Sequence, residues 1–317
     1  MQAVYLDYDS VACADLSTTS LQALLPALRF YDQTASADLR DRIRDAEIIL
    51  VDQTKISRDD LAAAPRLRLI SLAGTGYDHI DVSAAEARGI AVCHVRGYCT
   101  LSVAQHVWSM ILSLTQQLCA YQRLATDGSW AKQGPVNVQA HPIRELAGRR
   151  LGIVGWGDLG QAVAKIGEAF GMQVLIANRA GAEPAPGRLE LRQLLQSADI
   201  VSLHCPLTAA TARMIGASEL ELMQPDALLI NTARGGLVDS TALAAALRAR
   251  KLGGAGVDVL AQEPPVDGDP LLDPTIPNLL VTPHVAWAAR EARQRSLDEM
   301  ALNIRDFLDG GRRGRVV

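Results

Sequence analysis

The chain has 317 residues, of which 49% are hydrophobic and 21% are charged, a balance that is ordinary for a folded globular protein. The formal net charge is −4, and the one basic cluster, Arg312-Arg313-Gly314-Arg315, is short enough to be a solvated end, so we expect no nucleic-acid binding. No uncharged apolar run of 18 residues and no basic region leading into an apolar one is present, so we expect a cytoplasmic protein without a membrane span.

The length predicts two domains, and the first 98 residues have the rhythm of a doubly wound α/β domain. Short apolar runs predict strands over residues 3–6, 48–51, 67–72 and 90–95, with helices over 21–28 and 82–88 between them. A long helix is predicted over 101–124, and the glycines and prolines of 128–142 predict a connecting loop.

The most informative motif is Leu151-Gly152-Ile153-Val154-Gly155-Trp156-Gly157-Asp158-Leu159-Gly160, an apolar run that ends in glycines spaced G-x-G-x-x-G. In a dinucleotide-binding turn, Gly155 permits the tight bend, Gly157 lets the backbone approach a pyrophosphate, and Gly160 lets the following helix pack closely. A helical run over 161–170 and a strand over 173–177 follow, which complete a βαβ unit.

The residue just past that second strand contacts the adenosine ribose in such domains, and an acid there binds the 2′-hydroxyl of NAD. Here the residue is Asn178, followed by Arg179. A neutral side chain beside a guanidinium favours the 2′-phosphate of NADP(H) over NAD(H). The alternative is that Arg179 is a solvated loop arginine and that both cofactors are used.

Four further strands are predicted over 200–203, 228–231, 256–259 and 279–282, with a helix over 240–250. The final helix, over 291–308, is long enough to return to the first domain. We therefore expect a discontinuous substrate-binding domain of residues 1–98 and 286–317 and a dinucleotide-binding domain of residues 99–285.

Polar residues follow the ends of three of these strands: Arg234, Glu263 and His284. A guanidinium that grips a carboxylate, an imidazolium that protonates an oxygen, and a carboxylate that raises the imidazole pKa are the groups needed to reduce a 2-oxo acid. Each has an ordinary alternative: a surface ion pair for the arginine, a solvated loop acid for the glutamate, and a turn residue for the histidine.

The cysteines and histidines do not indicate a metal site. The six histidines form no ligand cluster. Five cysteines lie scattered without C-x-x-C pairs and are expected to be reduced: Cys13, Cys93, Cys99, Cys119 and Cys205. Cys205, in His204-Cys205-Pro206, is expected to be a buried apolar residue rather than a nucleophile.

Taken together, these residues resemble the D-isomer-specific 2-hydroxyacid dehydrogenases over nearly the whole chain. The matching motifs are Gly74-Thr75-Gly76-Tyr77-Asp78-His79-Ile80-Asp81, Val103-Ala104-Gln105-His106, the Gly155–Gly160 turn, His204-Cys205-Pro206-Leu207-Thr208, Asn231-Thr232-Ala233-Arg234-Gly235, Val257-Asp258-Val259 with Glu263-Pro264, and Pro283-His284. The resemblance implies a Rossmann nucleotide-binding domain and a flavodoxin-like substrate domain, both doubly wound α/β, with the site in the cleft between them.

The resemblance also assigns roles. Arg234, Glu263 and His284 would be the catalytic trio, with His284 as the acid/base. The substrate would be bound by Gly74, Thr75 and Gly76 together with Arg234, His284 and Trp287. The alternative for Trp287 is a packing role alone. The cofactor would be held by Gly155, Gly157, Asp158, Leu159, Gly160, Asn178, Arg179, Pro206, Thr232, Ala233, Arg234, Asp258 and His284.

Within the family, Gln105 and the run His284-Val285-Ala286-Trp287-Ala288 look like the glycerate dehydrogenase or hydroxypyruvate reductase branch. The implied function is NADPH-preferring reduction of hydroxypyruvate or glyoxylate by a homodimer, with NAD(H) possible. Two alternatives remain open: a reductase of bulkier 2-oxo acids such as phenylpyruvate, and a nucleotide-sensing protein similar to the corepressor relatives.

Overall fold

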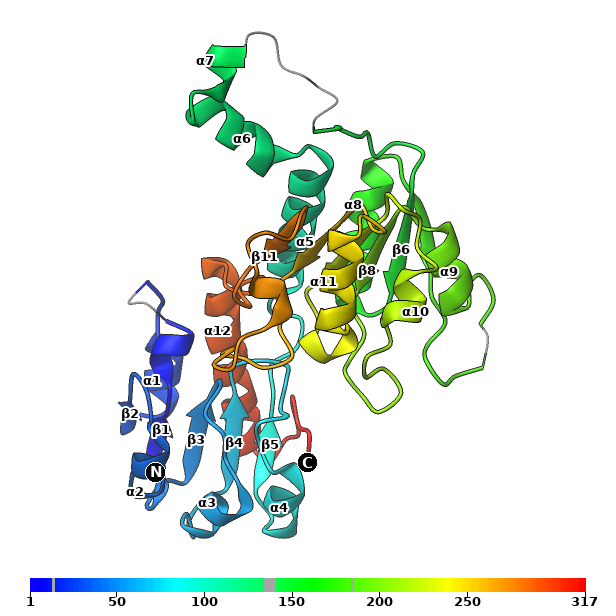
Figure 1. Cartoon of the computed structure of the whole chain (residues 1–317). Coiled ribbons are helices and arrows are strands. Elements are labelled where there is room, and N and C mark those ends of the chain that lie inside the picture. Colours follow the sequence, from blue (N-terminus) through cyan, green and yellow to red (C-terminus); the bar gives the residue numbers. More distant parts are fainter. Residues whose placement is uncertain (13–14, 134–140, 184) are drawn as a thin grey trace. The chain divides into compact units, whose positions relative to one another are not determined.

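The computed structural model describes residues 1–12, 15–133, 141–183 and 185–317, and these form two compact units (Figure 1). Unit 1 consists of Met1–Cys99 and Trp287–Val317, and unit 2 consists of Thr100–Ala286. Cys13 and residues 134–140 of the predicted loop lie outside the described residues. Each unit contains its own parallel sheet, which confirms the predicted fold class of two doubly wound α/β domains.

Unit 1 is built on a five-stranded sheet with the order β2-β1-β3-β4-β5, in which all pairs are parallel. This is the flavodoxin-like order that the resemblance implies. The strands are β1 (Ala3–Tyr5), β2 (Leu28–Phe30), β3 (Ile48–Val51), β4 (Leu69–Leu72) and β5 (Ala91–Cys93), and the helices are α1 (Thr19–Leu24), α2 (Ser36–Ile43), α3 (Arg58–Ala62), α4 (Val82–Ala87) and α12 (Arg290–Leu308). A short 3₁₀ turn, η1, spans Tyr8–Ser10.

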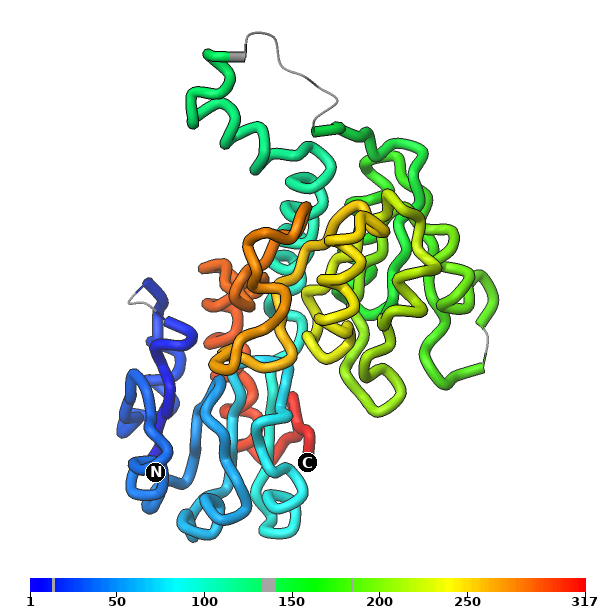
Figure 2. Tube along the Cα trace, viewed as in Figure 1, coloured from blue at the N-terminus to red at the C-terminus, as the bar shows by residue number. Residues whose placement is uncertain are grey.

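The C-terminal segment of unit 1 corrects one expectation. Rather than being a solvated end, it pairs with the edge strand β5, beside which it runs in Figure 2. The amide of Val316 donates to the Val92 carbonyl over 2.7 Å, and that of His94 donates to the Gly314 carbonyl over 2.9 Å. Because an edge strand presents unpaired backbone groups, the tail satisfies groups that would otherwise be free to pair with another chain.

Unit 2 is built on a six-stranded parallel sheet with the order β11-β10-β9-β8-β6-β7. Its strands are β6 (Arg150–Val154), β7 (Gln173–Ile176), β8 (Ile200–Leu203), β9 (Leu228–Asn231), β10 (Gly254–Val257) and β11 (Leu279–Val281). Its helices are α5 (Thr100–Thr115), α6 (Leu118–Thr126), α7 (Ser129–Gln133), α8 (Asp158–Ala169), α9 (Leu191–Ser197), α10 (Ala217–Leu220) and α11 (Ser240–Arg248), with 3₁₀ turns η2 (Gly235–Leu237) and η3 (Pro270–Leu272).

The central strands of unit 2 are buried along their whole length, as expected for a parallel sheet covered by helices on both faces. Their register aligns the carboxyl ends in one row: Val154 lies opposite Leu203, Leu203 opposite Asn231, Asn231 opposite Val257, and Val257 opposite Val281. The loops that leave these strands therefore start side by side, which is where doubly wound sheets bind ligands.

The prediction of one continuous helix over 101–124 is wrong. The structure has two helices, α5 and α6, separated at Gln117, whose φ of 53° lies in the left-handed region that helices cannot continue through. α5 buries one face against α8, where the Trp108 indole donates to the Val163 carbonyl over 3.1 Å, whereas α6 buries no residue. The predicted loop also contains a short helix, α7.

None of the helices in the described ranges is long and apolar enough to cross a lipid bilayer.

Candidate active site

The glycine turn between β6 and α8 has the backbone that its sequence predicts. Gly155 has a φ of 104°, and a side chain there would lie 2.6 Å from the backbone of Cys205. A Cβ at Gly160 would approach the Gly155 carbonyl oxygen to 2.1 Å. A Cβ at Gly157 would meet no atom within 4 Å, so the start of α8 is open. This open, amide-lined helix start fits the pyrophosphate of a dinucleotide.

Past β7, both the nitrogen and the oxygen of the Asn178 side-chain amide form hydrogen bonds. Its Nδ2 donates to Glu190 Oε1 over 2.6 Å, and its Oδ1 accepts from the Ala185 amide over 3.1 Å. The backbone amide of Asn178 also donates to the Leu189 carbonyl over 2.7 Å. The end of β7 therefore lies beside a carboxylate that the motifs did not indicate, because Glu190 is twelve residues further along the chain.

The imidazole of His284 and the carboxylate of Glu263 form a pair, with His284 Nδ1 and Glu263 Oε2 2.7 Å apart. The other oxygen, Glu263 Oε1, accepts from the Leu260 amide over 2.7 Å, which fixes the carboxylate. The hydrogen bond to Glu263 raises the pKa of His284, against the lowering effect of burial. Burial alone would raise the pKa of Glu263, but the His284 hydrogen bond holds it below its ordinary value. The pair therefore favours an imidazolium beside a carboxylate.

Arg234 lies on the turn after β9, close enough for its charge to lower the pKa of both Glu263 and His284. The turn is shaped by Asn231, a buried residue at the end of the strand. Its Nδ2 donates to the Arg234 carbonyl over 2.9 Å, and its Oδ1 accepts from the Ala233 amide over 3.1 Å. Asn231 belongs to the same motif as Arg234, and its side-chain amide orients this backbone.

The turn that carries His284 is held by Asp258, which is 1% exposed. Asp258 Oδ1 accepts from the Val285 amide and Oδ2 from the Ala286 amide, both over 2.9 Å. Thr282 donates its hydroxyl to Asp258 Oδ1 over 2.5 Å and lies 3.0 Å from His106 Nε2. A buried carboxylate needs such partners, and here they come from the backbone next to His284.

A family model described as "D-isomer specific 2-hydroxyacid dehydrogenase, NAD binding domain" matches residues 108–286. A glycerate dehydrogenase from Methylorubrum extorquens is 42% identical over 273 residues, covering 86% of each chain. A hydroxypyruvate reductase from Blautia hydrogenotrophica is 33% identical over 98% of each.

The chain belongs to the D-isomer-specific 2-hydroxyacid dehydrogenase family. It is therefore an oxidoreductase that uses a nicotinamide cofactor, and the glycerate dehydrogenase-like branch predicted from its motifs is confirmed. Among solved structures, the NADPH-dependent glyoxylate/hydroxypyruvate reductase from Sinorhizobium meliloti, in complex with NADP and malonate, is similar to it. The TM-score is 0.83 at 28% identity, covering 100% of this chain and 97% of that one.

The remaining predicted site residues of this dehydrogenase are divided between unit 1 and unit 2. Gly74, Thr75 and Gly76 follow β4 in unit 1, where the Thr75 hydroxyl donates to the Val95 carbonyl over 2.7 Å. Trp287 also belongs to unit 1, where it is partly buried against the core. In unit 2, the buried Thr232 Oγ1 has no hydrogen-bond partner among the described residues and follows the aligned end of β9.

Cys205 and His204, at the end of β8, are poorly suited to acid-base or nucleophilic chemistry. Burial raises the pKa of the Cys205 thiol, and its Sγ lies 3.7 Å from Met214 Sδ. Burial lowers the pKa of His204 to about 4. Within the described ranges, no group of three or more acidic, histidine or cysteine side chains could hold a metal ion.

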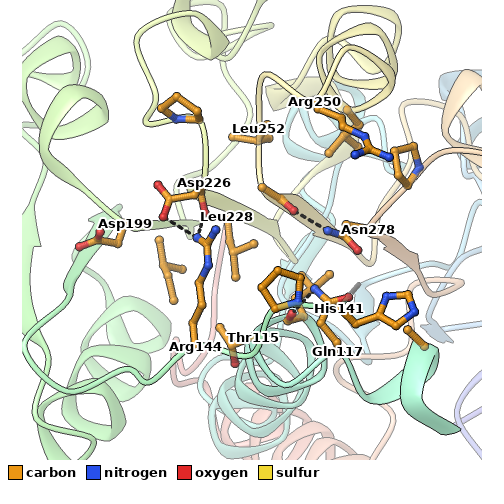
Figure 3. Close-up of a pocket in the computed structure, with 18 of the residues that line it drawn as sticks. Thr115, Gln117, His141, Arg144, Asp199, Asp226, Leu228, Arg250, Leu252 and Asn278 are labelled. Atoms are coloured by element: carbon orange, nitrogen blue, oxygen red, sulfur yellow. Dashed lines mark hydrogen bonds and ion pairs between the residues drawn. The ribbon is translucent and has the colours of Figure 1, made fainter. Parts of the chain in front are cut away.

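A cavity of about 460 Å³ in unit 2 is lined by residues at the amino ends of the strands (Figure 3). The trio, in contrast, lies on loops that follow the carboxyl ends of the strands. Its polar wall is made of ion pairs, in which Arg144 Nη1 lies 2.5 Å from Asp226 Oδ2 and Arg149 Nη1 lies 3.3 Å from Asp199 Oδ1. Its apolar wall is formed by Leu114, Ile200, Leu228, Leu247 and Leu252. Two of its arginines, Arg144 and Arg149, already pair with carboxylates, and the cavity is at the end of the sheet away from the Glu263–His284 pair.

Proposed function

We propose that this dehydrogenase reduces hydroxypyruvate or glyoxylate to the corresponding 2-hydroxy acid. Relatives at 42% and 33% identity carry the names glycerate dehydrogenase and hydroxypyruvate reductase, and the similar Sinorhizobium meliloti enzyme is named for both oxo acids. The observation that carries the proposal is the 2.7 Å contact between His284 Nδ1 and Glu263 Oε2.

In this proposal His284 is the proton donor. Nδ1 is committed to Glu263, so Nε2 is the nitrogen that delivers a proton to the carbonyl oxygen of the substrate. When bound, a nicotinamide cofactor would supply the hydride for the reduction. Glu263 stabilises the imidazolium before transfer, and Arg234 binds the carboxylate of the oxo acid with a planar fork that also polarises its carbonyl.

We assign the dinucleotide to unit 2. Its pyrophosphate would bind the amides at the start of α8, between Gly157 and Gly160, with the amides of Asp158 and Leu159 as donors. Pro206, Thr232, Ala233 and Asp258 follow the aligned strand ends, where the nicotinamide half would lie. Both Asp258 oxygens already accept backbone bonds, so we give this residue a positioning role in addition to any contact with the cofactor.

NADP(H) is the favoured cofactor in this proposal, and NAD(H) is the second. Asn178 places no acid of its own at the ribose position, and Arg179 is exposed beside it. A guanidinium at that position pairs with a 2′-phosphate but gains little from a hydroxyl. The similar Sinorhizobium meliloti reductase is named NADPH-dependent.

We assign a share of substrate binding to residues of unit 1, in addition to Arg234 and His284 of unit 2. The amides around Thr75 and Gly76 would bind the carboxylate of the oxo acid, and Trp287 would limit the size of its side chain. The test is a panel of 2-oxo acids assayed with NADPH and NADH. Higher kcat/KM for hydroxypyruvate and glyoxylate than for phenylpyruvate supports the proposal. A preference for phenylpyruvate favours a reductase of bulkier acids, and no turnover of hydroxypyruvate or glyoxylate would contradict the proposal.

We also propose that unit 2 mediates a homodimer. α6 buries no residue, and α6 and α7 expose two large apolar side chains, Leu118 (53% exposed) and Trp130 (56% exposed). Gln117, Ala120 and Arg123 of this segment line the cavity at the amino ends of the strands. Exposed apolar residues beside an open cavity are typical of a surface that a partner covers.

A further inference from the structure

The ribose end of the cofactor site contains a carboxylate that belongs to Glu190. Asn178 occupies the position at the end of β7 where an acid would bind the 2′-hydroxyl of NAD. Its amide is held on both sides, by the Ala185 amide and by Glu190 Oε1, which lies 2.6 Å from Asn178 Nδ2. The residue at the ribose position is therefore neutral, but its side chain holds the negative charge of Glu190 beside that position.

The backbone explains why Glu190 reaches this place. Leu189 forms a parallel bridge with Ala177, so the chain before Glu190 lies alongside the end of β7 as a one-residue edge strand. Glu190 leaves this strand at the carboxyl edge of the sheet, beside the residue after β7. It is also the N-cap of α9, yet its side chain makes no capping hydrogen bond and is bonded to Asn178 instead.

We propose that Glu190 is a specificity-determining residue that limits discrimination in favour of NADP(H). This inference rests on the proposed placement of the dinucleotide. The exposed carboxylate repels a 2′-phosphate, opposing the attraction of Arg179, and it can accept a hydrogen bond from the 2′-hydroxyl of NADH. Glu190 and Arg179 thus act in opposite directions, so the enzyme binds both cofactors with a modest preference.

The test is a pair of dissociation constants, for NADPH and NADH, measured without substrate by cofactor fluorescence. In Glu190→Gln, the ratio of the NADPH to the NADH dissociation constant should fall about fivefold at moderate salt, because one repulsive charge is removed. Glu190→Lys should lower it further. The matched control is Glu168→Gln, which removes an exposed acid from the last turn of α8, at the end away from the glycine turn.

Both constants come from the same sample, so a partly unfolded fraction cancels in the ratio. The shift should shrink below about twofold at 1 M salt, where the Debye length is about 3 Å. A ratio that stays within twofold of the parent in both Glu190 variants would overturn the inference. So would a shift of equal size in Glu168→Gln, or one that salt does not reduce.

A separate variant tests the proposed placement of the dinucleotide at the start of α8, on which this inference rests. Gly157→Val should abolish binding of both cofactors, because the new side chain would fill the open space at the start of α8. If Gly157→Val binds both cofactors normally, the proposed cofactor site is wrong and so is the inference. If Gly157→Val loses both and the Glu190 variants keep the parent ratio, only the inference fails.

Discussion

Asp258 holds the backbone of His284. The His284 amide donates to the Asp258 carbonyl over 2.7 Å, and the two following amides donate to its carboxylate. His284 has a φ of 55°, a conformation that a residue with a side chain adopts only when its surroundings impose it. The acid of the proposed reaction is therefore placed through its backbone by a buried carboxylate.

Asp258→Asn tests this relationship. The amide keeps one acceptor oxygen and replaces the other with a donor that faces a backbone N–H, so the turn should shift. We expect kcat to fall about tenfold to a hundredfold, since small misplacements of a catalytic group have effects of this size. Steady-state kinetics with saturating cofactor measures it. An unchanged kcat would show that the turn keeps its shape without the carboxylate.

Glu263→Gln should change the pH dependence of reduction. The donor must be an imidazolium, so activity is lost as pH rises through the raised pKa of His284. Removing the Glu263 charge lowers that pKa, although Asp258 still acts to raise it and Arg234 to lower it. The falling limb should therefore move to lower pH. A limb that stays in place in a kcat profile from pH 5 to 10 would contradict the pairing.

Arg179→Ala combined with Asn178→Asp should move cofactor preference toward NADH. The variant loses the charge-assisted contact between Arg179 and the 2′-phosphate, which contributes about 1.5–3 kcal/mol. The ratio of kcat/KM with NADPH to kcat/KM with NADH should therefore fall about tenfold or more. Initial rates with each cofactor at a fixed oxo-acid concentration measure this ratio. A parent enzyme that already prefers NADH would contradict the proposed role of Arg179.

The exposed segment of α6 and α7 should carry self-association. Trp130→Asp together with Leu118→Asp places charges at both exposed apolar positions and should convert the dimer into a monomer, as measured by light scattering. The matched control is Leu302→Asp, on an exposed position of α12 in unit 1 (43% exposed). A variant that keeps the parent mass would exclude this surface.

The strand ends and the contact between Glu263 and His284 could be predicted because they depend on local patterns, whereas the catalytic roles of Arg234, Glu263 and His284 stay a prediction. Buried apolar runs followed by polar residues indicate where parallel strands end, and the pairing of Glu263 with His284 follows from the chemistry of a 2-oxo acid reductase. The break of the long helix at Gln117 could not be predicted, because Gln has no local preference that requires a left-handed φ.

Other features depend on backbone that is distant in sequence. The bond between Asn178 and Glu190 exists only because Leu189 returns beside Ala177. The C-terminal tail pairs with β5 more than 200 residues earlier in the chain, where only the folded sheet defines an open edge. Thr282 and His106 likewise meet Asp258 through the register of β10 and β11 and the packing of α5.

The most direct test of the mechanism is His284→Ala, with kcat and the cofactor dissociation constant measured on the same preparation. If His284 donates the proton, kcat for hydroxypyruvate reduction should fall about 10²- to 10⁴-fold while the dissociation constant for NADPH stays within a few fold of the parent. Near-full reductase activity in His284→Ala would contradict the mechanism and direct the search for the acid to His106, 3.6 Å from Asp258.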